Sequence, residues 1–265
     1  MKFIHITDLH LTAPETALNG SNPVDRLNAC LQDIENWHSD AAFCVLSGDL
    51  SEFSESCSYT WLKDRLAAFS IPCFLMIGNH DDRTIFLNVF PDQPKDSNGF
   101  VQHVHTSDGR VFIFLDTTKD GKNVHEGQLC PSRLIWLKNQ LVQAGDKPCY
   151  LFMHHPPFNI GISYVDDIKL EEAEEFAQTL ESGQNIQHVF FGHVHRMTYV
   201  NWRGTSFTSL PSLNHQIPLV SESVKGEYCT EPPAYGVVMV EPDQLTVHFN
   251  TFLQRDPLHQ TKLHN

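Results

Sequence analysis

Five short apolar segments of this 265-residue chain each run directly into polar residues of the kinds that bind metals. The segments are residues 2–6, 43–46, 73–77, 150–153 and 188–191, and each has the length of a buried strand. The residues that follow them are, in order, Asp8-Leu9-His10, Gly48-Asp49, Gly78-Asn79-His80-Asp81, His154-His155-Pro156 and Gly192-His193-Val194-His195. Functional sites in open α/β sheets gather outside the carboxyl ends of the strands. The sequence therefore predicts an α/β fold in which five strand ends share one site.

Helices and hairpins are predicted between and after these strands. Apolar side chains recur at helical spacing in residues 24–37 and in a helix that begins at Pro131, and residues 59–69 and 170–181 are further predicted helices. Turn residues separate strand-like segments at 100–105 and 110–115, 197–202 and 206–210, and 235–240 and 245–252. We expect a single domain over residues 1–265, with a motif-bearing core (1–210) followed by a loop and a C-terminal β hairpin (211–265).

The composition is that of an ordinary soluble globular protein, with 41% hydrophobic and 19% charged residues. No apolar run approaches the roughly 18 residues needed to span a bilayer. The first apolar run is also too short for a signal peptide, since Asp8 and His10 interrupt it. We therefore expect a cytoplasmic protein with no membrane partner. The formal net charge of −14 argues against binding of duplex nucleic acid, and seven cysteines without a CxxC pair favour free thiols.

The residue types at the strand ends suit a metal centre. Asp, His and Asn offer oxygen and imidazole nitrogen ligands, which fit zinc, manganese or iron, and no cysteine is among them. One residue separates Asp8 from His10 and His193 from His195, so an extended backbone would point both members of each pair to the same side. Glycines precede the polar residues at three of the strand ends and would let the backbone turn and approach closely.

Each motif alone has an ordinary structural explanation. Asp-x-His and Gly-Asp after a strand are often caps or turns, and His154-His155-Pro156 could be a surface loop. The run Asn79-His80-Asp81 could cap a helix at residues 84–90. Ligand-type residues at five successive strand ends nevertheless favour one metal centre over five unrelated turns.

Taken in order, the motifs D-x-H, G-D, G-N-H-D, H-x-P and G-H-V-H resemble the motif set of the calcineurin-like metallophosphoesterases. They span residues 8–195, about three quarters of the chain. The segments GNHDD, MHHPP and SLPSLNHQIP are similar to those of the bacterial class III branch of cyclic-nucleotide and glycerophosphodiester phosphodiesterases. The resemblance implies a four-layer α/β/β/α sandwich with a two-metal site and a β-rich C-terminal part.

The resemblance also implies a ligand for every position of the two-metal site. The first ion would be held by Asp8, His10 and His195. The second would be held by Asn79, His154 and His193. Asp49 would bridge the two ions, and His155 is not expected to be a ligand. Iron and manganese are the metals expected first, with zinc or cobalt as alternatives, because these ligand types do not distinguish them.

The implied activity is hydrolysis of small phosphodiesters, such as 3′,5′-cyclic nucleotides or glycerophosphodiesters, by a hydroxide held between two metal ions. Asp49 and His80 are the predicted catalytic residues. His80 would give a proton to the departing alkoxide, and Asp81 is a candidate to orient it. His80, Asn79 and His215 are the predicted substrate-binding residues, since His215 matches a histidine that this branch places near the active site.

The residue pattern also suggests which residues line the site and leaves alternative functions. Residues 12–22 are expected to rim the pocket, while Phe53, Phe158 and Tyr164 are either aromatic walls or packing residues. A phosphomonoesterase of the same superfamily is the first alternative, and a metal-free binding module that reuses the fold is the second. The β-rich end and the helix at 170–181 are candidate contacts for a homo-oligomer.

Overall fold

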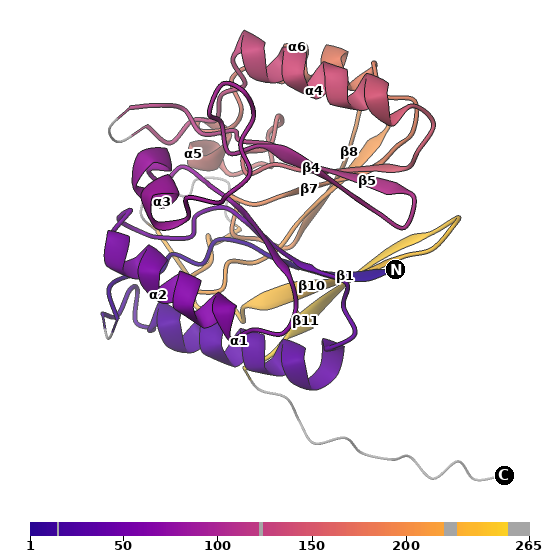
Figure 1. Cartoon of the computed structure of the whole chain (residues 1–265). Coiled ribbons are helices and arrows are strands. Elements are labelled where there is room, and N and C mark those ends of the chain that lie inside the picture. The colour runs from indigo at the N-terminus through magenta and orange to yellow at the C-terminus, as the bar shows by residue number, and fades with distance from the viewer. Residues whose placement is uncertain (15, 122–123, 220–226, 254–265) are drawn as a thin grey trace, which may run out of the picture.

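The computed structural model describes residues 1–14, 16–121, 124–219 and 227–253, and it contains two facing mixed β-sheets between two outer layers of helices (Figure 1). This arrangement confirms the predicted α/β/β/α sandwich. Within the described ranges the longest helix has 16 residues, and none combines the length and the apolar character that crossing a bilayer requires.

The first sheet has the strand order β11-β10-β1-β2-β3. Its strands are β1 (Lys2–Ile6), β2 (Cys44–Ser47), β3 (Cys73–Met76), β10 (Ala234–Val240) and β11 (Leu245–Thr251). The first three run parallel, so their carboxyl ends share one edge of the sheet. The hairpin β10-β11 pairs antiparallel with β1 and so completes this sheet, which supports our proposal of a single domain. Residues 220–226 and 254–265 of the predicted C-terminal part lie outside the described residues.

The second sheet has the strand order β4-β5-β6-β7-β9-β8. Its strands are β4 (His103–Ser107), β5 (Arg110–Phe114), β6 (Cys149–Phe152), β7 (Ile186–Phe191), β8 (Thr198–Trp202) and β9 (Thr205–Ser209). β5, β6, β7 and β9 run parallel, and the hairpin partners β4 and β8 form the two edges. The carboxyl ends of β6 and β7 therefore lie next to each other.

The helices cover the outer faces of the sheets. α1 (Pro23–His38), α2 (Ser56–Ala67) and α3 (Arg83–Val89) lie on the side of the first sheet, and α4 (Pro131–Ala144), α5 (Ser163–Asp166) and α6 (Ala173–Leu180) on the side of the second (Figure 1). The N-cap of α3 is Asp82, whose carboxylate accepts from Ile85 N at 2.9 Å, and not the preceding run of residues 79–81. α5 was not predicted, because four residues are too few to show a helical period.

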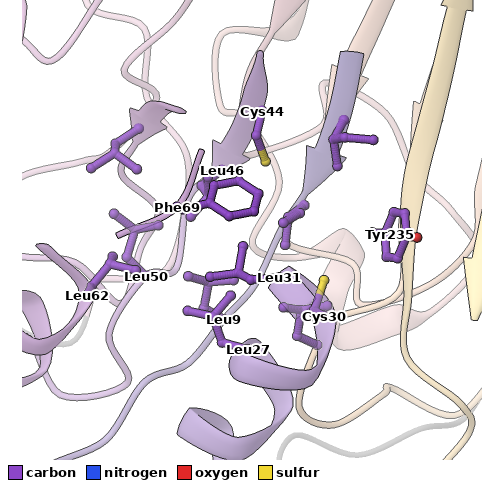
Figure 2. Close-up of a cluster of buried hydrophobic side chains, with 14 of the residues drawn as sticks. Leu9, Leu27, Cys30, Leu31, Cys44, Leu46, Leu50, Leu62, Phe69 and Tyr235 are labelled. Carbon is purple, nitrogen blue, oxygen red and sulfur yellow. The ribbon is translucent and has the colours of Figure 1, made fainter. Parts of the chain in front are cut away.

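Hydrophobic clusters fill the three spaces between the four layers. Leu27 and Leu31 of α1 and Leu62 of α2 are fully buried against Leu46 of β2 and its neighbours (Figure 2). A corresponding cluster joins α4, α5 and α6 to the second sheet. Burying side chains of this size removes enough apolar surface from water to hold each helix layer in place, at roughly 1.5–3 kcal/mol per side chain.

Aromatic rings fill the space between the two sheets. Phe3 of β1 meets Phe112, Phe152 and Phe190 of the opposite sheet edge-to-face, with ring centroids 5.5 to 5.9 Å apart. Truncating such a ring to alanine costs about 3–5 kcal/mol in a typical core. This packing fixes one sheet against the other, and therefore fixes the strand ends of both sheets relative to each other.

Candidate metal centre

The chain segments that follow β1 and β2 run side by side beyond the end of the first sheet. Asp8 N donates to Gly48 O at 3.1 Å, and His10 N donates to Asp49 O at 2.9 Å. Backbone hydrogen bonds therefore place Asp8 and His10 beside Asp49.

Five residues at the strand ends have a left-handed backbone. The φ angles are 54° at Asp8, 47° at His10, 49° at Asp49, 71° at His193 and 49° at His195. Such angles are uncommon outside glycine, and Asn, Asp and His are the residues that adopt them most readily. The paired ligand-type residues are thus brought together by tight turns. Our expectation that an extended backbone would align them was wrong.

The first group of candidate ligands comprises Asp8, His10, Asp49 and His195, whose ligand atoms all lie within 4.8 Å of one another. His10 Nε2 is 2.9 Å from His195 Nε2 and 3.6 Å from Asp49 Oδ2. Asp8 Oδ1 is 3.5 Å from His195 Nε2. All four side chains are buried, so little water competes for their ligand atoms.

A second group adjoins the first at Asp49. It comprises His154, His155 and His193, and Asn79 joins it because its Oδ1 lies 2.8 Å from His193 Nδ1. His154 Nε2 is 3.3 Å from Asp49 Oδ2, the same oxygen that approaches His10. His155 was not an expected ligand, and its Nδ1 is hydrogen-bonded to Thr117 Oγ1 at 2.8 Å.

Two glycines allow the backbone to pack against these side chains. A Cβ atom on Gly78 would lie 2.3 Å from Asp49 Oδ1 and 2.6 Å from His154 Nε2. A Cβ atom on Gly192 would lie 2.2 Å from Thr7 Oγ1 and 3.0 Å from His154 Nδ1. The close approach predicted at these positions therefore serves the site directly, since a larger residue would press on Asp49 and His154 at Gly78 and on Thr7, next to Asp8, at Gly192.

Burial and neighbouring charges set the protonation of the candidate ligands. Burial lowers the pKa of His10 and His193 well below the usual value, and that of His195 to about 4. Burial also lowers the pKa of His154, but attraction to carboxylates, led by Asp49, outweighs it and raises that pKa to about 9. Burial raises the pKa of Asp49, yet the adjacent histidines bring it well below the usual value.

These features fit the binding of metal ions. Neutral imidazoles and ionised carboxylates are the forms that coordinate metals, and the shifted pKa values of His10, His195 and Asp49 favour these forms. Burial raises the pKa of Asp8 to about 7, so a metal ion would have to displace a proton from Asp8 as well as from His154. His193 Nε2 is buried and has no hydrogen-bond partner within the part of the chain that the structure describes. Leaving such an atom unpaired costs about 1–3 kcal/mol, which coordination would offset. The raised pKa of His154 shows further that the carboxylates attract positive charge to this point.

His80 lies beside both groups without belonging to their shared ligand set. Its backbone N–H donates to Asp49 Oδ1 at 2.8 Å, and its Nδ1 donates to Glu52 O at 3.1 Å. Asp81 does not orient this ring as we had expected. Its carboxylate instead accepts from Gly78 N and from the two backbone N–H groups that follow Asp49, at 2.9 to 3.0 Å, and so orders the surrounding loop.

A cleft of about 640 Å³ opens over the two groups and is lined by His10, Asp49, Asn79, His80, His193 and His195. His215 also lines it, with its ring centroid 4.8 Å from that of His195. Tyr164 and, from the predicted rim, Leu18 and Asn19 complete part of the wall. Residue 15 of that rim lies outside the described residues.

Of the other two aromatic residues predicted near the site, one packs in the core and the other lines a cleft. Phe158 is buried against Phe191 and Phe207 in the core, so it packs and forms no part of the cleft wall. Phe53 is 61% exposed and lines a neighbouring cleft.

Two residues near the site were not predicted from the sequence. Glu52 contacts His10 and His80, and His125 contacts Asn79 Nδ2 through its Nδ1 at 3.1 Å. Glu52 follows Asp49 by three residues, so its closeness in sequence to a predicted ligand was a usable signal. His125 comes from a loop between β5 and α4 with no motif, and no comparable signal marks it.

The family comparison agrees with this geometry. Residues 1–197 match the model of a family described as calcineurin-like phosphoesterase. The chain is 37% identical over 262 residues to a probable cyclic nucleotide phosphodiesterase of Rhodopseudomonas palustris, covering 97% of this chain and 95% of that protein. It is 29% identical to a glycerophosphodiester phosphodiesterase of Enterobacter lignolyticus, covering 88% of this chain and 85% of that protein.

A solved structure shares the fold. A dimetal phosphatase from Danio rerio superposes with a TM-score of 0.74, covers 96% of both chains and is 14% identical in sequence. At this identity the likeness concerns the fold alone.

Proposed function

The chain belongs to the calcineurin-like phosphoesterase family, and on that premise we propose that it hydrolyses small phosphodiesters with the help of two metal ions. Family membership makes it a metal-dependent phosphoesterase. The observation that carries the proposal is the position of Asp49, because one carboxylate oxygen lies 3.6 Å from His10 Nε2 and 3.3 Å from His154 Nε2.

We assign the ligands according to the two groups. Asp8, His10 and His195 would hold one ion, and Asn79, His154 and His193 the other, with Asp49 shared. Two ions so held would neutralise the phosphate and activate a water molecule as the nucleophile. The groups meet at Asp49, so the ions would lie close enough to act on one phosphate.

His80 is the residue that we propose as proton donor to the leaving alkoxide. It lines the cleft, and its Nδ1 is already occupied by Glu52 O, which leaves Nε2 for the substrate. The backbone hydrogen bond from His80 N to Asp49 Oδ1 ties the position of this ring to the proposed bridging ligand. A well-placed proton donor typically contributes about 10²–10⁴-fold to the rate.

The shape of the surroundings favours a diester over a monoester. A second cleft of about 450 Å³ adjoins the first, and both are lined by Glu52, Asn79, His80 and His125. His80 therefore has space on two sides, which suits a phosphate that carries two ester substituents. Relatives named for cyclic nucleotides and for glycerophosphodiesters make these the substrates that we propose first.

The proposal is tested with protein loaded with manganese or iron and two chromogenic esters. We expect hydrolysis of bis(p-nitrophenyl) phosphate with a higher kcat/KM than that of p-nitrophenyl phosphate. A strong preference for the monoester would support the phosphomonoesterase instead. Absence of both stoichiometric metal and turnover would support the binding module. A panel of cyclic nucleotides and glycerophosphodiesters then identifies the substrate.

A further inference from the structure

One side of the cleft over the candidate metal centre is apolar. Beyond the candidate ligands and their neighbouring histidines, five apolar or aromatic side chains line the cleft: Leu18, Tyr164, Ile168, Ile217 and Tyr228. We call these five residues the apolar wall. Leu18 follows β1, Tyr164 and Ile168 belong to α5 and the turn after it, and the other two lie in the segment after β9. The wall is therefore built from three segments that are far apart in the sequence.

Backbone hydrogen bonds hold the segment after β9 that carries two of the wall residues. Gln216 and Cys229 pair in both directions, with Gln216 N donating to Cys229 O at 3.0 Å and Cys229 N donating to Gln216 O at 2.8 Å. The Gln216 side chain donates to Ser212 O at 2.7 Å, and Ser212 Oγ donates to Asp8 O at 2.8 Å. This part of the wall is therefore tied to the turn that carries the first candidate ligand.

Core packing holds the other tyrosine of the wall. Ile162 and Val165, on either side of the Tyr164 position, are buried in the core of the second sheet, and Tyr164 packs partly buried against the same cluster. Farther along, Leu170 N donates to Pro156 O at 2.9 Å, which joins this segment to the motif after β6. A wall that is already ordered loses little freedom when a ligand binds to it.

A row of rings leads from the candidate ligands to the apolar wall. The ring centroid of His215 lies 4.8 Å from that of His195 and 6.1 Å from that of Tyr228. Tyr228 is 47% exposed, so part of its ring is open to a ligand. A substituent on a phosphate bound at the candidate ligands would extend along this row toward Tyr228.

The charged side chains beside the apolar wall are acidic. Asp167 and Glu227 line the cleft, and among the described residues of its lining none is a lysine or an arginine. Burial, and after it the carboxylate of Glu227, raises the pKa of Tyr164 to about 12, so this ring stays neutral within the field of a negative charge. A second anionic group on the substrate would therefore meet like charge without a described cation to balance it.

The smaller neighbouring cleft of about 450 Å³ is lined differently. Arg83 and Lys119 contribute to it, and each is paired with a carboxylate, Arg83 with Asp116 at 2.8 Å and Lys119 with Glu171 at 2.6 Å. These paired charges are better solvated by water than by an apolar ligand. An uncharged aromatic substituent is therefore expected in the larger cleft.

We propose that the apolar wall receives an aromatic or apolar substituent of the phosphoester, and that the cleft selects substrates with no negative charge beyond that of the scissile phosphate. Tyr164 and Tyr228 are the specificity-determining residues for the first property, and Asp167 and Glu227 for the second. This inference rests on the phosphodiesterase function proposed above and narrows its substrate class.

Binding of phosphonates to manganese-loaded protein, followed by isothermal titration calorimetry, tests the apolar wall. A phosphonate carries one substituent on a P–C bond, so the measurement needs no turnover. We expect phenylphosphonate to bind about tenfold more tightly than methylphosphonate. Tyr164→Ala and Tyr228→Ala should each reduce this ratio about threefold and leave methylphosphonate binding unchanged. Tyr199→Ala is the matched control, because Tyr199 is an exposed tyrosine of β8 that does not line this cleft.

The compound 4-carboxyphenylphosphonate tests the charge preference, since it adds one carboxylate to the same ring. We expect it to bind about tenfold more weakly than phenylphosphonate. The double variant Asp167→Asn/Glu227→Gln should remove most of this difference. Glu175→Gln is the matched control, because Glu175 is an exposed glutamate in the first turn of α6, and it should keep the difference.

Turnover separates the role of the wall from the proposed function. The KM for bis(p-nitrophenyl) phosphate should rise in both tyrosine variants with kcat unchanged, because the wall holds the ground state and the transition state alike. Equal affinities for phenyl- and methylphosphonate, or an unchanged preference in both tyrosine variants, would overturn the role of the wall. Equal affinities for the two aryl phosphonates would overturn the charge preference. A preference for phenylphosphonate without hydrolysis of any diester would support the wall and overturn the proposed function.

Discussion

Replacing Gly78 by alanine tests the geometry of the centre without removing any candidate ligand. Gly78 follows β3 and has an ordinary backbone conformation, so the change adds a single methyl group without backbone strain. That methyl would lie 2.3 Å from Asp49 Oδ1 and 2.6 Å from His154 Nε2, against 3.4 Å for ordinary contact. It would also lie 2.6 Å from the backbone nitrogen of Asp49, so both Asp49 and His154 must move by about 1 Å.

The expected cost follows from this displacement. A misplacement of 1 Å at a reacting centre can reduce the rate about 100-fold, which corresponds to about 2.7 kcal/mol in the activation free energy. Crowding of a packed interior also lowers the free energy of unfolding, by about 1–3 kcal/mol. We therefore expect Gly78→Ala to remain folded at 25 °C, with kcat/KM for bis(p-nitrophenyl) phosphate reduced about 100-fold.

The matched control is Gly109→Ala in the turn between β4 and β5. Its added methyl meets nothing within 4 Å, but its φ of 72° makes alanine cost about 1–2 kcal/mol in stability. The two variants should lose similar stability in urea unfolding, while only Gly78→Ala loses activity. Wild-type kcat/KM and two tightly bound metal ions in Gly78→Ala would refute the inferred positions of Asp49 and His154.

Three further predictions concern single side chains. Asp49→Ala should lose the shared ligand, and with it metal at both groups and turnover by a factor on the order of 10³ or more; near-normal activity would contradict the assignment. His80→Ala should keep its metal but lose about 10²–10⁴-fold in kcat, with a larger loss for an alkyl than for a nitrophenyl leaving group; equal losses would argue against proton donation. Burial lowers the pKa of His188 to about 4, so the unfolded chain takes up a proton first as pH falls below the usual value of 6.5. The contribution of His188 to the free energy of unfolding is complete above pH 6.5 and is lost as the pH falls toward 4. Between pH 7.5 and pH 5 the free energy of unfolding, measured in urea, should therefore fall by about 2 kcal/mol less in His188→Gln than in the wild type. An equal fall in both proteins would contradict this.

The layers and the strand ends could be predicted because their signals are local. β1 was placed at Lys2–Ile6 from its apolar run, and α4 was started correctly at Pro131. The residues that follow five strands had to converge once those strands ran parallel within two facing sheets. The resemblance of the motifs to a known family supplied the ligand assignment that the spacing alone left open.

Other features depend on contacts between distant segments, which one sequence does not display. Glu52 gains its position only because the segments after β1 and β2 pair beyond the sheet. Nothing in the residue pattern distinguishes the left-handed turns at Asp8 and His193 from extended backbone. Asp81 had the sequence position of a partner for His80, but three backbone N–H groups compete successfully for its carboxylate.

The left-handed backbone at five strand-end residues implies a trade-off between activity and thermal stability. Such a conformation costs up to about 1–2 kcal/mol in a residue other than glycine and less in Asp, so five of them together reduce the net stability of the domain appreciably. Glycine at any of these positions would relieve the strain and delete a candidate ligand at once. A selection for thermal tolerance alone would therefore be expected to erase the centre position by position, while the surrounding sandwich became more durable.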